Sequence, residues 1–242
     1  MKLVHPDMEN ALFLPEQHMG FLAIENPQTL YEFSREFLSQ IDDDGGLFCL
    51  SENANELAIP KVMAVIDSPL QLEHNPRRAI TALYKQLEKH CVEEAAMDEM
   101  QEFLDALSLR LKRLLPELDV ELEEIETPSW QAVFKFFDLK FKSSYTNLEE
   151  ALLDYIRMTR TYLKMQFFVI IGAVQFLTKE GLENLNKQAV YEELRMLFVD
   201  GCLCEEKQPK QTRALIIDSD LCEIIRYNRG ESTTDQPEDM GL

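Results

Sequence analysis

Six carboxylates lie within eleven residues between Pro116 and Glu126, and this run is the first candidate for chemistry in the sequence. In an extended strand the side chains alternate between two faces, so Leu118, Val120 and Leu122 share the face opposite most of the acids. Acids on one face lie about 6–7 Å apart and repel, and a hard cation such as Ca²⁺ relieves that repulsion. The candidate metal ligands are Glu117, Asp119, Glu121, Glu123, Glu124 and Glu126.

The same run also fits a structural explanation without metal. Its apolar face indicates packing on another element, which argues against a simple disordered acidic segment. A strand at the edge of a sheet uses charge to prevent aggregation, and a solvated edge strand accounts for the pattern equally well. From the residues alone, the solvated strand is the more usual explanation.

The formal net charge of −20 excludes non-specific nucleic-acid binding by the chain as a whole, but not by a local basic surface. Residues 76–114 hold seven basic and seven acidic side chains. This window is therefore neutral, and the remainder of the chain carries the entire acidic excess.

The segments around this window predict an α/β fold. Short strands are expected at Leu3–Val4, Ala11–Leu14 and Gly20–Ile24. A helix should begin at Pro27 with Asn26 as its N-cap. Later apolar runs predict further strands at Leu47–Leu50 and Val62–Ile66.

Asn75 and Pro76 repeat the cap signature and open nearly forty residues without Gly or Pro, in which apolar residues recur every three or four positions. This is either one long arm or two helices that meet between Val92 and Met97. A helix capped by Thr127 and Pro128 should follow, with Trp130, Val133, Phe134 and Phe137 on one face. The next helix should begin after Asn147.

The clearest α/β signal lies near the end of the chain. A strand at Phe167–Gly172, a helix from Thr178 and a strand at Met196–Val199 form a βαβ unit with parallel pairing, and Arg213–Asp218 adds a strand. We therefore predict an α/β head with a mainly parallel sheet, formed by residues 1–74 and 127–227. Residues 75–126 form an inserted helical extension, and residues 228–242 a disordered tail.

Motifs of enzymes are missing from the sequence. There is no phosphate-binding loop, no dinucleotide-binding glycine pattern and no zinc-protease or serine-hydrolase motif. Asp67, Asp200 and Asp218 each follow an apolar strand, where α/β enzymes place carboxylates, but aspartates at strand ends more often close turns. The sequence does not resemble that of an enzyme.

Five scattered cysteines, an odd number, indicate reduced thiols and a cytoplasmic protein. No apolar run reaches the roughly 20 residues of a membrane span, and the first residues lack the apolar core of a secretory signal.

The order of these segments resembles a known family. The similarity lies in Gly20–Glu25, Ile59–Asp67, Val133–Phe141, Asn147–Leu163, Phe167–Ile171 and Phe176–Glu180. It covers roughly residues 2–226, and no single motif is diagnostic. The family is the Csn-two family of spacer-acquisition proteins of subtype II-A CRISPR systems.

This resemblance implies a head similar to nucleotide-binding folds but without a phosphate loop, and an inserted helical extension. It also implies a non-catalytic homotetrameric ring that binds Ca²⁺ and threads linear double-stranded DNA by its ends. The expected partners are other CRISPR adaptation proteins and the effector nuclease. No association with a membrane is implied.

Site residues follow from the resemblance position by position. The family's acidic stretch best matches Glu121, Glu123 and Glu124, while the match of Glu117, Asp119 and Glu126 depends on where a one-residue gap falls. With the resemblance, calcium becomes the favoured explanation of the acidic run. The DNA-binding candidates are Arg77, Arg78, Lys85, Lys89, Arg110, Lys112 and Arg113. Arg77, Lys85 and Lys89 are expected on roughly one side of a helix.

Two other functions stay open at this point. The helical arm could bind acidic or apolar surfaces of protein partners without touching DNA. A divalent-metal phosphohydrolase would instead need Asp67, Asp200 or Asp218 to converge on one metal ion.

Overall fold

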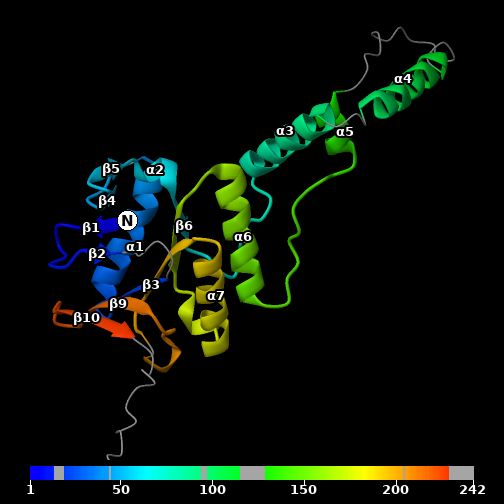
Figure 1. Ribbon diagram of the computed structural model, residues 1–242. Coiled ribbons are helices and arrows are strands. Elements are labelled where there is room, and N and C mark those ends of the chain that lie inside the picture. Colours follow the sequence, from blue (N-terminus) through cyan, green and yellow to red (C-terminus); the bar gives the residue numbers. More distant parts are fainter. Residues whose placement is uncertain (14–18, 44, 94–96, 115–128, 204, 229–242) are drawn as a thin grey trace, which may run out of the picture. The chain divides into compact units, whose positions relative to one another are not determined.

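The computed structural model describes the chain except for residues 14–18, 44, 94–96, 115–128, 204 and 229–242 (Figure 1). The chain divides into two compact units. The head consists of Met1–Leu72 and Ser144–Leu242, and the helical unit of Glu73–Ser143. Each unit is described below by itself.

A six-stranded sheet forms the centre of the head. Its strand order is β10-β9-β3-β8-β7-β6. The parallel pairs are β9 with β3, β3 with β8, β8 with β7, and β7 with β6. Only β10 is antiparallel to its neighbour. The predicted α/β class with a mainly parallel sheet is confirmed. The strands are β3 (Gly20–Ile24), β6 (Met63–Ile66), β7 (Phe167–Ile171), β8 (Arg195–Asp200), β9 (Thr212–Ile217) and β10 (Glu223–Asn228).

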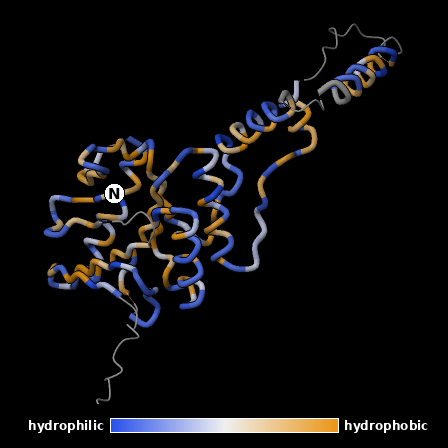
Figure 2. Tube along the Cα trace, in the orientation of Figure 1, coloured by the Kyte–Doolittle hydropathy of each residue, from blue (hydrophilic) through white to orange (hydrophobic). Residues whose placement is uncertain are grey.

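Both faces of this sheet are buried. Phe167 and Val169 of β7 belong to one core cluster, while Phe168 and Ile170 belong to the other. Because successive side chains of a strand point to opposite faces, a strand covered on both sides must be apolar throughout. This explains the continuous apolar runs in the sequence, which are coloured as hydrophobic in Figure 2.

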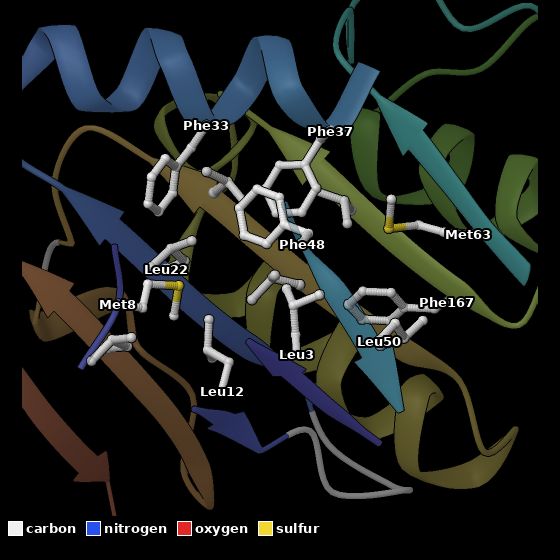
Figure 3. Packing of buried hydrophobic residues seen from close by; sticks show 14 of the residues in the cluster. Leu3, Met8, Leu12, Leu22, Phe33, Phe37, Phe48, Leu50, Met63 and Phe167 are labelled. Carbon is white, nitrogen blue, oxygen red and sulfur yellow. The ribbon is translucent and has the colours of Figure 1, made fainter. Parts of the chain in front are cut away.

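The first core cluster lies between the sheet and α1 (Pro27–Ile41), together with a small antiparallel sheet in the order β2-β1-β4-β5. In Figure 3, Phe33 and Phe37 of α1 lie over Phe48, and the rings of Phe37 and Phe48 stack at 4.1 Å. Glu36 accepts backbone hydrogen bonds from Leu47 and Phe48, which fastens α1 to the small sheet. Its strands are β1 (Lys2–Val4), β2 (Leu12–Phe13), β4 (Cys49–Glu52) and β5 (Asn55–Leu57).

The second core cluster lies under α6 (Leu148–Leu163) and α7 (Lys179–Tyr191). Strand β7, helix α7 and strand β8 form the predicted βαβ unit, because β7 and β8 are parallel neighbours. The predicted caps of the helices in the head are also present. Asn147 accepts from the Glu150 N–H at 2.8 Å, and Thr178 accepts from the Gly181 N–H at 3.0 Å.

In its described residues the helical unit contains α3 (Arg77–Glu93), α4 (Met97–Leu114) and α5 (Trp130–Phe136). The long helical stretch is described as α3 and α4, and residues 94–96 between them lie outside the described part. Ser129, rather than Thr127, caps α5, since its hydroxyl accepts from the Ala132 N–H at 3.3 Å. Asn75, expected as the cap of α3, exchanges two hydrogen bonds with the backbone of Phe141.

The helical unit extends to Ser143, past the boundary at residue 126 that the sequence suggested. Contacts of Tyr84 in α3 explain the difference. Its hydroxyl donates to the Leu139 carbonyl at 3.0 Å, and its ring lies 5.7 Å from that of Phe134. These contacts join two segments fifty residues apart, a separation that local sequence patterns do not reveal.

Several elements were not expected from the sequence. They are β5, β10 and the short helix α2 (Ile59–Val62), while β4 begins two residues later than the predicted strand. The predicted tail lies outside the described residues, apart from Asn228 at the end of β10. In the described part of the chain no helix is long and apolar enough to cross a bilayer. Cys49, Cys91, Cys202 and Cys222 are free thiols.

The N-cap of α1 provides a test of the head. Asn26 accepts from the N–H groups of Gln28 at 3.0 Å and Thr29 at 3.1 Å. Asn26→Ala should lower the free energy of unfolding by about 1 kcal/mol in urea denaturation, because both donors lose their acceptor. Asn26→Ser restores an acceptor and should retain most of the stability. Equal losses in both variants would contradict the capping role.

Candidate functional site

A face of α3 gathers three exposed cations. Arg78, Lys85 and Lys89 are exposed and separated by seven and four positions. At about 100° per residue their directions fall within about 40° of one another. These three residues, called here the α3 basic face, are the most regular positive surface among the predicted DNA-binding residues.

The opposite side of α3 packs inside the helical unit and fixes which face is exposed. Ala79 and Tyr84 are buried there. Glu88, one of only two acidic residues in α3, accepts a hydrogen bond from the Gln131 side chain of α5 at 3.0 Å. This carboxylate is therefore directed toward α5.

Arg77 does not lie on this face, although the sequence placed it there with Lys85 and Lys89. It is exposed but lies about 100° around the helix from Arg78. The helical spacing instead groups Arg78 with the two lysines, because seven and eleven residues are close to two and three turns.

The predicted basic residues of α4 do not form a comparable face. Arg110, Lys112 and Arg113 are exposed, but Lys112 points at least about 100° away from the two arginines. All three lie near the C-terminus of α4, where cations interact favourably with the helix dipole. That role explains their position without DNA.

An apolar groove of about 740 Å³ lies between α4 and α5. Phe136 and Phe103 in this groove are 83% and 61% exposed, far more than an apolar core residue. The apolar residues of α4 recur every three or four positions, and Leu104 is the buried residue of the lining. The residues of this α4 groove are Phe103, Leu104, Leu107, Leu111, Ala132, Val133, Phe136 and Phe137.

The predicted calcium ligands lie outside the described residues. This applies to the whole set, Glu117, Asp119, Glu121, Glu123, Glu124 and Glu126. Elsewhere, within the described part of the chain, no group of three or more His, Cys, Asp or Glu side chains is placed to hold a metal ion. The calcium site in the acidic run therefore stays a prediction.

The turn after β3 occupies the position where nucleotide-binding folds hold phosphate. Such folds leave the first backbone N–H groups of the helix open to the ligand. Here Asn26 occupies the N–H groups of Gln28 and Thr29, and Pro27 has no N–H to offer. This turn therefore caps its helix and forms no phosphate cradle.

Two of the aspartates at strand ends close turns. Asp218 accepts from the N–H groups of Asp220 at 2.9 Å and Cys222 at 2.8 Å. Asp200 accepts from the Val174 N–H at 3.0 Å, which ties the end of β8 to the segment after β7. The turn-closing explanation, weighed against a metal site, accounts for both residues.

Burial raises the pKa of Asp200 above its ordinary value of 3.8, while the Val174 N–H and the charge of Lys207 oppose the shift. A raised pKa means that the folded state holds the proton more tightly, so the ionised carboxylate reduces stability as pH rises. The Lys207 ammonium donates to the carbonyls of Val174 at 3.3 Å and Leu177 at 2.9 Å. It therefore lies on the turn that Asp200 closes.

Asp200→Asn should remove this pH dependence. We expect the free energy of unfolding of the unmodified protein, relative to the variant, to fall as pH rises above 3.8, measured by urea denaturation at several pH values. Asp220→Asn, which removes an exposed carboxylate, controls for the change in net charge. A difference that stays constant with pH would contradict the buried-carboxylate effect.

Known proteins support the fold and identify the family. The crystal structure of Stu0660 of Streptococcus thermophilus matches with a TM-score of 0.52 at 10% identity, and covers 94% of this chain and 76% of that chain. At this identity the likeness shows the fold alone. No curated protein sequence matches the chain. The family described as CRISPR-associated protein (Cas_Csn2) matches residues 40–221. This match spans most of the chain, from the end of α1 to the turn after β9, and the chain therefore belongs to the Cas_Csn2 family of CRISPR-associated proteins.

Proposed function

We propose that this protein serves spacer acquisition in a type II-A CRISPR system as a non-catalytic, calcium-dependent ring that binds the ends of linear double-stranded DNA. The observation that carries the proposal is the α3 basic face, in which Arg78, Lys85 and Lys89 point the same way from one helix. Membership of the Cas_Csn2 family supplies the CRISPR context.

The dimensions of the α3 basic face suit a DNA backbone. Eleven residues of helix span about 16 Å at 1.5 Å per residue. One DNA strand advances about 3.4 Å per phosphate, so the face extends along about five phosphates. Contacts of this kind carry no sequence information, and binding should therefore be independent of sequence.

The net charge of −20 makes assembly important for DNA binding. A single chain repels DNA at most of its surface, and three cations provide only a small electrostatic attraction. In a homotetrameric ring, four copies of the α3 basic face would act on one duplex. The gain from such linked contacts comes from effective concentration rather than from new chemistry.

Calcium is assigned to the acidic run on the chemistry of its donors. Ca²⁺ takes six to eight oxygen ligands, which carboxylates supply, and its charge offsets the repulsion among them. Glu121, Glu123 and Glu124 are the principal candidates. Neutralising these acids would also reduce the repulsion between copies of a strongly acidic chain and so favour the ring.

The remaining partners are proteins. We assign the protein to the cytoplasm, where it would act with other adaptation proteins and the effector nuclease. Catalysis is not part of this proposal, because Asp200 and Asp218 serve to close turns. The turn after β3 also lacks free N–H groups for a phosphate.

The α4 groove favours a second candidate function. Its lining is apolar and exposed, as a surface that binds an apolar segment of another protein should be. On this alternative the protein is an interaction module that binds no DNA. The experiments below distinguish the two functions.

DNA binding should depend on ends and on the α3 basic face. We expect linear duplexes to bind in Ca²⁺ and closed circles of the same length not to bind, in a gel-shift or anisotropy assay. Changing Arg78, Lys85 and Lys89 to Gln should weaken binding and reduce the slope of log K against log salt by about 0.9 for each lost phosphate contact.

A matched variant separates this effect from net charge. This control variant removes three exposed lysines from the head and should leave the salt slope unchanged; its changes are Lys61→Gln, Lys179→Gln and Lys187→Gln. Equal binding of circles and linear duplexes would overturn the end-binding proposal. If neither circles nor linear duplexes bind, the result favours the second candidate function, the interaction module that binds no DNA.

Calcium should control the oligomer. Glu121→Ala with Glu123→Ala removes two proposed ligands, and we expect weaker calcium binding by calorimetry and a smaller mass by light scattering. Glu56→Ala with Glu206→Ala removes two exposed carboxylates of the head and should preserve both properties. If the unmodified protein has the same mass in Ca²⁺ and in chelator, the acidic run is a solvated strand instead.

A further inference from the structure

A polar pocket of about 400 Å³ lies in the head. It is located where α6 and α7 end and where β7 and β8 begin, since Phe167 and Arg195 at the starts of these strands are paired. Parallel α/β sheets usually bind ligands at the opposite edge, beyond the carboxyl ends of the strands. The lining of this N-edge pocket is Arg160, Lys164, Met165, Gln166, Glu193 and Arg195.

Two cations of the N-edge pocket are held by neutral acceptors. Arg160 donates to the backbone carbonyl of Glu192. The Lys164 ammonium donates to the Thr161 carbonyl at 2.7 Å. A carbonyl orients a cation without cancelling its charge, so both side chains keep a full positive charge at the pocket and have further donors.

The third cation has an acidic partner. Arg195 lies 2.7 Å from the Glu52 carboxylate, and both side chains are largely shielded from solvent. Its guanidinium stays charged at every physiological pH. Arg195 therefore adds a fixed, half-buried positive group to the pocket.

Opposing carboxylates are few. Glu193 lines the N-edge pocket and is exposed. The neighbouring Glu192 carboxylate binds Arg157, whose Nε lies 3.0 and 3.1 Å from its two oxygens. The lining of the N-edge pocket thus contains three cations and one acid, in a chain whose net charge is −20.

Two charged residues of the N-edge pocket have a backbone conformation that costs free energy. Lys164 and Glu193 have φ values of 63° and 54°, in the left-handed region where helices usually end with glycine. A residue with a Cβ is less favourable there, by roughly 1 kcal/mol or more. Lys164 nevertheless stands at the C-cap of α6, which places its ammonium at the pocket.

We propose that the N-edge pocket binds a phosphate group. Two arginines and a lysine around a small concave site are typical of phosphate recognition, in which an arginine donates two parallel hydrogen bonds. The volume lies within the range of small-ligand sites. The phosphate comes either from a free nucleotide or from a DNA backbone, and the site acts independently of the α3 basic face.

The test uses the full-length protein with inorganic phosphate, with a 5′-mononucleotide and with a short DNA duplex as competitor. Calorimetry or NMR titration should show saturable phosphate binding that Arg160→Gln weakens about tenfold, the effect of one charge-assisted hydrogen bond. Glu193→Gln should tighten binding, since it removes the opposing carboxylate. Lys187→Gln, which removes an exposed lysine of α7, should have no effect.

Lys164→Gly separates binding from folding. Glycine suits the left-handed backbone at this position, so the melting temperature should stay equal or rise while phosphate binding falls. Loss of binding in a variant that folds at least as well cannot be attributed to unfolding.

The measurements with the mononucleotide and with the duplex identify the source of the phosphate. Tighter binding of the mononucleotide, without competition from the duplex, assigns a free nucleotide. Competition by the duplex, retained when Arg78, Lys85 and Lys89 are changed to Gln, assigns a DNA backbone. The proposal would be overturned if the protein bound no phosphate, or if the Arg160→Gln and Lys164→Gly variants bound phosphate as tightly as the unmodified protein. Displacement of phosphate only by an acidic peptide would also overturn it.

Discussion

Electrostatic repulsion is the constraint on which the arrangement of this protein depends. A chain with a net charge of −20 can present positive charge only where its fold separates cations from carboxylates. On α3 the separation comes from helix packing, because Glu88 is directed toward Gln131 of α5 while three cations face solvent. In the N-edge pocket it comes from backbone carbonyls, which hold Arg160 and Lys164 without neutralising them.

The two-sided burial of the central sheet explains why these surfaces lie where they do. Strands β3, β7 and β8 present apolar side chains to both core clusters, so polar chemistry is confined to the ends of the strands. At the carboxyl ends, Asn26, Asp200 and Asp218 use their side chains to close turns. The edge that usually binds nucleotides is thus occupied by turn-closing side chains, and the anion sites that we propose lie at the opposite edge and on the helical unit.

Local patterns in the sequence predicted much of the fold. Apolar runs located every strand of the large sheet except β10. Asn26, Asn147 and Thr178 marked the starts of helices because capping depends on residues only two or three positions away. The attachment of α5 to α3 was not predictable in this way, since Tyr84 and Leu139 meet only in the folded unit. The α4 groove was missed for a related reason: a stripe of leucines has the same spacing whether it is buried or exposed.

The candidate site shows the same division between local and distant information. The sequence named the basic residues of α3 and α4, and helical geometry then separates Arg78, Lys85 and Lys89 from the others. The N-edge pocket combines α6, the turn after α7 and the start of β8, whose nearness depends on the parallel pairing of β7 and β8. No spacing rule in the sequence connects Arg160 with Arg195.

The small size of the α3 basic face has a consequence for function. Three phosphate contacts give a salt slope of only about −2.7, whereas proteins that bind DNA through six to ten phosphates show much steeper dependence. A monomer with this face and an otherwise acidic surface is a weak DNA binder. If DNA is the ligand, the useful affinity must therefore arise from several copies acting together, so whatever controls assembly also controls DNA binding. On the proposed function, the acidic run controls assembly and the α3 basic face contacts DNA, so a change in either is expected to weaken DNA binding.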